Sequence, residues 1–248
     1  MSKCLIVTGG GRGIGAEVSR KAAKQGYSVC VNFHRDQTSA QKLVRELEKE
    51  GANALAYQAD VSREEEVEAL FQTVEKHLGT PEALVNNAGI LDLQTRVDGM
   101  NAERIQRIFA VNVTGSFLCA REAVKRMSTK YGGTGGSIVN LSSGAAKFGS
   151  LGEYVDYAAS KAAIDTLTIG LAREVAKEGI RVNAVRPGFI DTEIHQSGGE
   201  PDRMERVRPL VPMKRVGQAE EVADAIMWLL SDKASYTTGT ILDVSGGR

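Results

Sequence analysis

Short apolar segments alternate with longer amphipathic segments along the whole chain, and this alternation constrains the fold more than any other feature of the sequence. The short segments are rich in β-branched residues and predict strands. The longer segments repeat their apolar residues with helical spacing, and several of them end at a glycine. Strands are expected at residues 3–8, 28–33, 53–59, 82–86, 137–141, 181–185 and 240–244, and helices at 14–25, 38–50, 63–78, 102–127, 155–178 and 220–230.

A strand–helix–strand order repeated this often predicts an α/β fold. Because crossovers between parallel strands are right-handed, helices are expected on both faces of the sheet. We therefore predict a Rossmann-type, doubly wound parallel sheet of about seven strands, in a single domain that spans residues 1–248. Ligands of such sheets bind at the carboxyl ends of the strands, so the loops that follow the strands are the segments that matter for function.

One long stretch, residues 188–218, breaks the alternation with several glycines and prolines. An irregular segment of this length inside a compact domain is usually functional. We expect it to form a lid over the substrate. Its histidine, His195, is interpreted as a surface residue rather than as a substrate contact.

The composition excludes several classes of function. Lys and Arg number 31, and Asp and Glu number 31, so no basic excess indicates a nucleic-acid partner. No apolar run is long enough to span a membrane, and the first one is too short for a signal peptide. The spacing of Cys4, Cys30 and Cys119 suits neither a zinc site nor a disulfide framework. We expect no metal site, reduced and buried thiols, and a cytoplasmic location.

A glycine-rich turn, residues 8–15, follows the first expected strand, and a helix begins directly after it. Glycines let the backbone turn tightly and approach an anion closely. The start of the helix then offers free N–H groups and a positive dipole end to a pyrophosphate. An ordinary tight turn is the alternative, because a glycine-rich loop alone is weak evidence. The residues expected to contact a dinucleotide here are Gly9, Arg12, Gly13, Ile14 and Gly15.

The end of the second strand bears on which dinucleotide is bound. An NAD site usually has an acidic residue there for the ribose 2′-hydroxyl, but Phe33 occupies that position. Arg12 and Arg35 could instead bind a 2′-phosphate. Asp36 is a complication, because its carboxylate could reach back to a ribose. We therefore favour NADP(H) over NAD(H), with NAD(H) as the alternative.

Further motifs follow the later strands in a fixed order. They are Asp60-Val61, Asn86-Asn87-Ala88-Gly89, Asn112, Ser143, Tyr157 with Lys161, and Pro187-Gly188 with Thr192. Together they resemble the short-chain dehydrogenase/reductase family over the whole chain, and within it the branch that holds 3-oxoacyl-carrier-protein reductases and glucose 1-dehydrogenases. Ser143 lies 14 residues before Tyr157, one more than expected in the carrier-protein reductases, which puts an acyl-carrier role in doubt.

The resemblance implies roles for these residues. It implies that Asp60 and Val61 contact the adenine, and that Thr192 contacts the nicotinamide carboxamide. It implies that Asn112 holds a water linking Lys161 to bulk solvent. The remaining residues expected to line the cofactor site are Asn87, Ala88, Gly89, Tyr157, Lys161, Pro187 and Gly188. Family members of this length are mostly tetramers that pair the two long helices and the last strand, so a homotetramer is expected.

Tyr157 and Lys161 are four residues apart, so they share one face of a helix. A free tyrosine has a pKa of about 10, and a nearby ammonium favours its ionised form. We assign Tyr157 as the general acid in reduction and the general base in oxidation. Ser143 is expected to donate a hydrogen bond to the substrate oxygen, with Ser142 as its competitor.

The predicted function is an NADP(H)-dependent oxidoreductase that moves hydride between the nicotinamide and the carbonyl or alcohol carbon of a small molecule. Two alternatives stay open. One is an NAD-linked sugar or alcohol dehydrogenase similar to glucose 1-dehydrogenase. The other is a protein that binds NADPH as a redox sensor and catalyses nothing. The sequence leaves the substrate and the physiological direction open.

Overall fold

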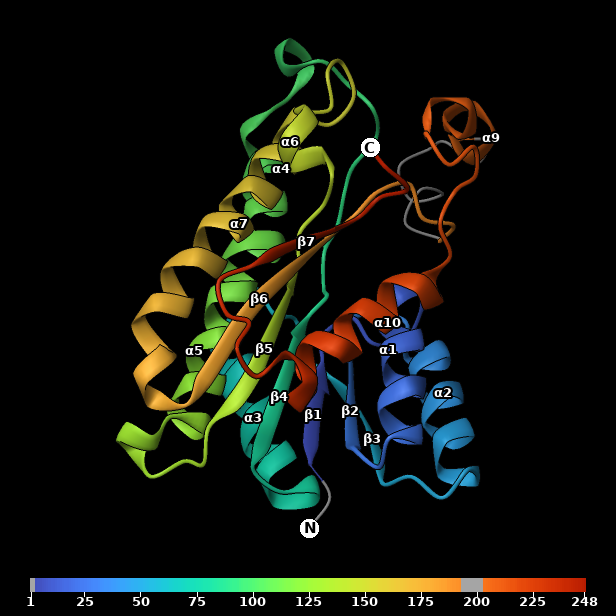
Figure 1. Ribbon diagram of the computed structural model, residues 1–248. Coiled ribbons are helices and arrows are strands. Elements are labelled where there is room, and N and C mark those ends of the chain that lie inside the picture. Colours follow the sequence, from blue (N-terminus) through green and yellow to red (C-terminus); the bar gives the residue numbers. More distant parts are fainter. Residues whose placement is uncertain (1–2, 193–202) are drawn as a thin grey trace.

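A seven-stranded parallel sheet forms the centre of the computed structural model, which describes residues 3–192 and 203–248. Neighbouring strands follow the order β3-β2-β1-β4-β5-β6-β7, and every pair is parallel. Helices cover both faces (Figure 1), which confirms the predicted doubly wound α/β fold. The strands are β1 Cys4–Val7, β2 Ser28–Phe33, β3 Ala54–Gln58, β4 Pro81–Asn86, β5 Gly136–Leu141, β6 Ile180–Pro187 and β7 Ile241–Val244.

Helices α1, α2 and α10 pack on one face of the sheet, and α3, α5 and α7 pack on the other (Figure 1). Their bounds are α1 Gly13–Lys24, α2 Gln37–Lys49, α3 Glu64–Leu78, α5 Gly115–Met127, α7 Val155–Val175 and α10 Ala219–Leu230. Three shorter helices are α4 Ala102–Phe109, α6 Ala145–Phe148 and α9 Arg203–Val207. Among the described residues, no helix has the length and apolar character that crossing a membrane requires.

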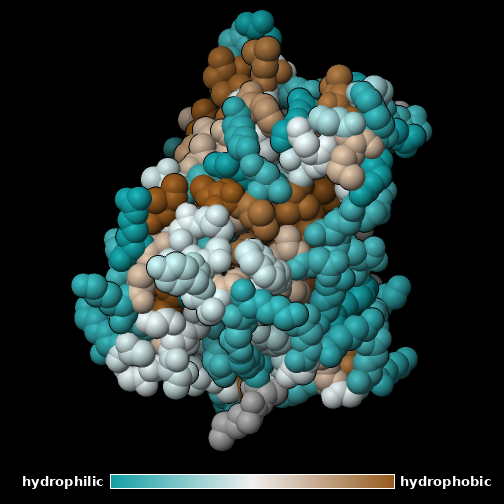
Figure 2. Space-filling model, viewed as in Figure 1, coloured by the Kyte–Doolittle hydropathy of each residue, from teal (hydrophilic) through white to brown (hydrophobic). Residues whose placement is uncertain are grey.

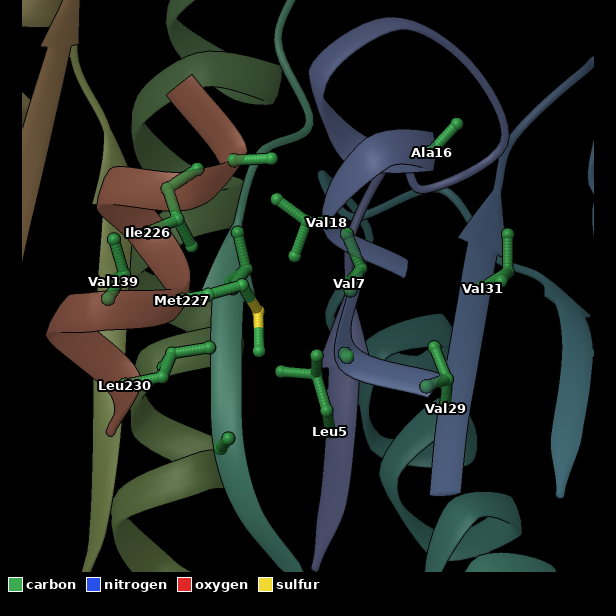
Figure 3. Packing of buried hydrophobic residues seen from close by; sticks show 14 of the residues in the cluster. Leu5, Val7, Ala16, Val18, Val29, Val31, Val139, Ile226, Met227 and Leu230 are labelled. Carbon is green, nitrogen blue, oxygen red and sulfur yellow. The ribbon is translucent and has the colours of Figure 1, made fainter. Parts of the chain in front are cut away.

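The alternation of side chains along β1 divides the core into two layers. Leu5 and Val7 lie on the same face of the sheet as Val18 of α1 (Figure 3), whereas Ile6 points to the other face and packs in the layer that holds Phe71 of α3. All five side chains are fully buried. Burying a side chain of this size contributes about 1.5–3 kcal/mol, so both layers hold the central strand in position.

The long helix predicted over 102–127 is divided in two. A π-helical turn, Ala110–Thr114, lies between α4 and α5, and Asn112 is in its middle. Such turns widen a helix by one residue and are frequent at functional sites. Apolar periodicity did not predict the interruption, because the apolar residues keep nearly the same face on both sides of it.

The irregular stretch 188–218 leaves the sheet after β6 and returns beside its own start. Ile190 forms an isolated parallel bridge with Gly217, and the amide of Asp191 donates to the Gly217 carbonyl at 2.9 Å. The described part of the stretch contains α9, so it is less irregular than expected. His195 lies outside the described residues.

Candidate active site

A cavity of about 1120 Å³ runs along the carboxyl ends of the strands, where ligands of doubly wound sheets bind. Two predicted residues, Gly15 and Asn112, pack against its wall and do not line it. Every other predicted site residue lines the cavity: Gly9, Arg12, Gly13, Ile14, Arg35, Asp60, Val61, Asn87, Ala88, Gly89, Ser143, Tyr157, Lys161, Pro187, Gly188 and Thr192.

The glycine-rich loop between β1 and α1 requires its glycines for two different reasons. Gly9 and Gly13 have φ angles of 60° and 53°, in the left-handed region that glycine adopts without strain. Gly15 has an ordinary φ, but a Cβ there would lie 2.6 Å from Nδ2 of Asn87. No acidic residue occupies the first turn of α1. The loop therefore presents the start of a helix to the cavity with no acidic side chain in its first turn, which suits a pyrophosphate.

Asn87 joins the loop after β4 to the loop after β1. Its side-chain Nδ2 donates to the carbonyl oxygens of Thr8 at 2.8 Å and Gly9 at 2.9 Å. In return, the Thr8 hydroxyl accepts from the backbone amides of Asn87 and Ala88, both at 3.0 Å. These four bonds fix the shape of the glycine-rich loop at the point where β1 and β4 separate.

Asn32 in β2 supports the same loop, and the sequence analysis missed it. Its Oδ1 accepts from the backbone amide of Gly9 at 3.3 Å, and its Nδ2 donates to the carbonyl of Ala59 at 3.0 Å. The side chain is 2% exposed, and a buried amide in a strand of apolar residues requires such partners. A polar residue inside the apolar segment 28–33 was the signal that could have identified it.

The rim of the cavity beyond β2 and β3 carries the charged residues predicted to select the cofactor. Arg12 and Arg35 are both exposed there. The carboxylate of Asp36 caps α2 by accepting from the amide of Ser39 at 3.0 Å. Hydrogen bonds from Ser39, and to a lesser extent the charge of Arg12, lower the pKa of Asp36. The Asp36 carboxylate is therefore already used as the N-cap of α2.

Asp60 follows β3, and hydrogen bonds hold its carboxylate in one orientation. Its Oδ1 accepts from the amide of Ser62 at 2.9 Å and from the Ser62 hydroxyl at 2.7 Å. Burial opposes ionisation, but these hydrogen bonds outweigh it and lower the pKa of Asp60. Its Oδ2 lies 3.6 Å from Nε2 of His34. Asp60 is thus held ionised at the rim, beside Val61.

At the other end of the cavity, Ser143, Tyr157 and Lys161 lie together. The hydroxyls of Ser143 and Tyr157 are hydrogen-bonded, and the Lys161 ammonium lies 5.7 Å from the centroid of the Tyr157 ring. Burial raises the pKa of Tyr157, while the bond to Ser143 and the charge of Arg203 oppose that rise. The phenol is therefore protonated at neutral pH, which is the form that a general acid needs.

Lys161 is 4% exposed, and its ammonium donates to the carbonyl of Leu141 at 2.7 Å. Burial lowers the pKa of Lys161 to about 8, although the charge of Asp165 raises it. One N–H of this ammonium is directed at Leu141, and the ammonium remains 5.7 Å from the centroid of the Tyr157 ring. Lys161 is therefore a buried amine whose pKa lies close to neutral pH.

Asn112 connects the loop after β4 to the helix that carries Tyr157. Its Oδ1 accepts from the amide of Ile90 at 2.8 Å, and its Nδ2 donates to the carbonyl of Ile90 at 2.9 Å and to the Ser160 hydroxyl at 3.0 Å. A Cβ on Gly89 would lie 3.5 Å from Oδ1 of Asn112 and 3.3 Å from Nζ of Lys161. Gly89 therefore lets these two groups approach each other.

Two neighbouring residues competed with the predicted ones in the sequence. Ser142 is buried, and its hydroxyl donates to the carbonyl of Lys161 at 3.1 Å, so it supports the backbone of α7. Tyr154 is 4% exposed, and its ring stacks against the guanidinium of Arg203. Of the two serine hydroxyls, that of Ser143 is the one bonded to Tyr157.

Comparison with known proteins identifies the family to which this geometry belongs. A family model described as "Enoyl-(Acyl carrier protein) reductase" matches residues 9–248. The chain belongs to the short-chain dehydrogenase/reductase family. Members of this family are oxidoreductases that bind a nicotinamide cofactor and act on small molecules. The resemblance predicted from the motifs is therefore confirmed.

Three similar proteins match this short-chain dehydrogenase/reductase over nearly its whole length. The "Uncharacterized oxidoreductase YgfF" of Escherichia coli (strain K12) is 57% identical, over 98% of each chain. "3beta-hydroxysteroid dehydrogenase 1" of Eggerthella lenta is 41% identical, over 99% of this chain and 93% of its own. "Glucose 1-dehydrogenase 2" of Bacillus subtilis (strain 168) is 38% identical, over 99% and 94%. Two of these names specify different substrates, a 3β-hydroxysteroid and glucose, and the first specifies none, so similarity alone does not select a substrate.

In this short-chain dehydrogenase/reductase, the end of β6 forms part of the cavity wall. A Cβ on Gly188 would lie 2.7 Å from Cα of Ser245, so only glycine fits between β6 and the segment after β7. Pro187 is buried beside it, and Thr192 is half-buried at the edge of the described residues. These three predicted residues lie together on one side of the cavity.

The part of the cavity lined by α9 contains residues to which the sequence analysis gave no role. Glu153, from the loop before α7, accepts from Arg203 at 2.6 Å and from Arg206 at 3.0 Å. Arg203 and Arg206 belong to α9. Arg248 lines the same region from the segment after β7. Sequence spacing gave no signal for these pairs, because their partners are about 50 residues apart or lie on different loops.

Proposed function

We propose that this short-chain dehydrogenase/reductase is an NADP(H)-dependent enzyme that interconverts a carbonyl group and an alcohol in a small molecule. The proposal depends above all on one observation. Ser143, Tyr157 and Lys161 lie together at one end of a long cavity whose other end is bordered by the glycine-rich loop. A proton donor, a second hydroxyl and a buried amine in such a group suit the protonation of a substrate oxygen.

In the direction of reduction, Tyr157 donates its phenolic proton to the carbonyl oxygen of the substrate. Ser143 donates a hydrogen bond to the same oxygen and holds it beside the phenol. The dihydronicotinamide, when bound, supplies the hydride to the carbonyl carbon. The C=O π bond becomes an O–H and a C–H bond, and Tyr157 is left as a tyrosinate. In the direction of oxidation, that tyrosinate accepts the proton of the alcohol.

Lys161 stabilises the tyrosinate formed in this step. Its ammonium lies beside the Tyr157 ring in a buried environment, where an opposite charge has a larger effect than in water. A pKa of about 8 keeps most of Lys161 charged at neutral pH and lets it exchange protons there. By resemblance, Asn112 holds a water through which Lys161 regains its proton, and Lys161 binds the nicotinamide ribose.

The residues along the cavity fit a dinucleotide. The positive φ angles of Gly9 and Gly13 expose backbone amides at the start of α1, which suits a pyrophosphate. Arg12 and Arg35 at the exposed rim suit a 2′-phosphate. The carboxylate of Asp36 caps α2, which supports NADP(H) over NAD(H). Asp60 and Val61 at the rim suit an adenine, and Pro187, Gly188 and Thr192 suit the nicotinamide.

The proposal extends to the organisation of the chain. We propose one domain over residues 1–248, because both core layers continue across the whole sheet. Residues 188–218 act as a lid that closes over the nicotinamide when substrate binds. The three buried thiols are free, which supports the predicted cytoplasmic location.

We also propose a homotetramer. Large apolar side chains are exposed on both long helices, including Phe117 of α5, 51% exposed, and Ile169 of α7, 37% exposed. A band of hydrophobic side chains also crosses the face over β6 and the edge strand β7 (Figure 2). Exposed apolar areas of this kind mark interaction sites. Both regions are those that the family resemblance assigns to subunit contacts.

A turnover screen tests the proposed function. Purified protein is mixed with NADPH or NADH and a panel of ketones, aldehydes and one enoyl thioester, and oxidation of the nucleotide is followed. For the direction of oxidation, a panel of alcohols and sugars is offered with NADP or NAD. We expect ketone reduction with NADPH. Turnover only of the enoyl thioester, or tight NADPH binding without turnover of any substrate, would contradict the proposal and favour an enoyl reductase or a redox sensor.

A further inference from the structure

The substrate end of the cavity contains a stacked arginine that the reaction described above does not use. The guanidinium carbon of Arg248 lies 4.6 Å from the centroid of the Phe189 ring and 5.2 Å from that of Phe148. Phe189 follows β6 and Phe148 ends α6, so the two rings come from different loops. The Arg248 carbonyl accepts from the Ser245 hydroxyl at 2.6 Å, which holds its backbone. All three side chains line the cavity that contains Tyr157.

Stacking leaves the edge of the guanidinium unused. Aromatic rings contact the face of the group, whereas its N–H donors lie in the plane and point outward. Nη1 of Arg248 is buried and has no hydrogen-bond partner among the residues that the structure describes. A buried donor without an acceptor is unfavourable and calls for an explanation. An acceptor that arrives with the substrate provides one.

The other charged groups nearby already have partners. Arg203 and Arg206 share the carboxylate of Glu153. Arg107 forms an ion pair with Asp92. Five basic side chains line this end of the cavity against one acidic one: Arg107, Lys161, Arg203, Arg206 and Arg248 against Glu153. The region is therefore positive, and a positive cleft attracts an anion.

The shape of the site selects among anions. A guanidinium edge binds the two oxygens of a carboxylate in a planar, bidentate arrangement. The rings of Phe148 and Phe189 flank it, and Leu151 and Leu210 also line the cavity, which suits a carbon skeleton and not a strongly hydrated phosphate. One guanidinium with an unused edge also matches one negative charge.

We propose that Arg248 binds a carboxylate of the substrate, and that the substrate is therefore an oxo acid or the corresponding hydroxy acid. The carboxylate pairs with the edge of Arg248 while the carbonyl oxygen lies at Ser143 and Tyr157. Phe148 and Phe189 hold the guanidinium in one orientation. This inference rests on the proposed function, because it names the substrate class of the same site.

Matched pairs of substrates test the inference. Short and medium-chain aliphatic oxo acids are compared with their methyl esters, which keep the ketone and lose the charge. For the wild type we expect kcat/KM to be at least about tenfold higher for the acid, because charge-assisted bidentate bonds are among the strongest. Arg248→Gln should reduce this acid-to-ester ratio by about tenfold or more, mainly through KM of the acid. Arg248→Lys, which keeps the charge but not the fork, should give an intermediate ratio.

Arg208→Gln is the matched control, because Arg208 is an exposed arginine in residues 188–218 that does not line the cavity. It should keep the wild-type ratio. Equal use of acid and ester by the wild type, or an unchanged ratio in Arg248→Gln, would overturn the inference and leave the proposed function intact. If no carbonyl compound is turned over, the proposed function fails instead. Calorimetric binding of the oxo acid to wild type and Arg248→Gln then still decides the inference, and equal binding overturns it.

Discussion

Arg104 of α4 and Asp156 of α7 form a buried, bidentate ion pair, and Asp156 is the residue that precedes Tyr157. Nε of Arg104 lies 2.7 Å from Oδ2 of Asp156, and Nη2 lies 3.3 Å from Oδ1. The same Oδ1 accepts from the backbone amide of Tyr157 at 2.9 Å. Arg104 also donates to the carbonyl of Leu93 at 2.6 Å. One guanidinium thus fixes the first turn of α7 and the loop after β4 together.

Removing one partner of this pair is expected to be costly. Arg104→Met leaves the Asp156 carboxylate buried without its counter-charge, which typically costs about 3–5 kcal/mol. The double variant Arg104→Met/Asp156→Asn removes the uncompensated charge and should recover part of that loss. Urea unfolding of the wild type, both single variants and the double variant measures the coupling. Additive losses in the double variant would show that the two side chains do not stabilise each other.

Tyr157→Phe tests the proton donor. The variant keeps the ring but has no proton to give, so turnover should fall by at least about a hundredfold. Binding of NADPH, followed by nucleotide fluorescence, should persist. Tyr154→Phe is the comparison, because Tyr154 also lines the cavity but precedes α7, and the residue four positions after it is Ala158 rather than a lysine; it should lose less than about tenfold. Near-normal turnover in Tyr157→Phe would contradict the assignment.

The rate of carbonyl reduction should depend on pH through Lys161. Burial lowers the pKa of this amine to about 8. Below that pH the ammonium is charged and stabilises the tyrosinate formed in the reaction. Above it the amine is neutral and that stabilisation is lost, so kcat for reduction should be level below about pH 8 and fall as the pH rises further. The profile is measured at saturating NADPH. A kcat that stays level up to about pH 10 would mean that another group supports Tyr157.

Arg12→Ala and Arg35→Ala test the choice of cofactor. Each variant removes a cation from the rim of the cavity, so the affinity for NADPH should fall by about tenfold while that for NADH changes much less. Fluorescence titration with both nucleotides measures the preference. Arg45→Ala is the control, because Arg45 is exposed on α2 and does not line the cavity. Equal losses for both nucleotides would favour NAD(H).

Asp36→Ala tests whether Asp36 only caps α2 or also binds the ribose of the cofactor. If Asp36 only caps α2, the variant should lose about 0.5–2 kcal/mol of stability and keep its affinity for NADH. Thermal unfolding and the same titration measure both quantities. Loss of NADH affinity without loss of stability would instead assign Asp36 to the ribose.

Phe117→Arg tests the subunit contact proposed for the long helices. A charge on the exposed apolar side of α5 should split the tetramer into smaller species, as measured by light scattering after size-exclusion chromatography. Tyr131→Arg provides the control, because Tyr131 is 60% exposed in the turn after α5. A wild type that is already monomeric would overturn the proposal.

The sequence predicted features that depend on local pattern. Glycine spacing and the strand that precedes it identified the loop at Gly9 and Gly13, and helical spacing identified Tyr157 with Lys161. Features that depend on partners distant in sequence were missed. The Arg104 and Asp156 pair spans 52 residues, and neither residue differs in the sequence from an ordinary surface charge. Helical spacing placed Lys161 beside Tyr157, but only the coordinates show that the ammonium also donates to the Leu141 carbonyl.

The bonds between Thr8 and Asn87 connect residues 79 positions apart. The first strand–helix–strand unit contains every glycine of the loop but cannot complete its shape alone, because Asn87 arrives only with β4. A chain growing on the ribosome would therefore become able to bind a dinucleotide only after its fourth strand has joined the first. Closure over such a separation is slow compared with local folding. A nucleotide that binds only the closed loop would then hold the newly made sheet together by mass action.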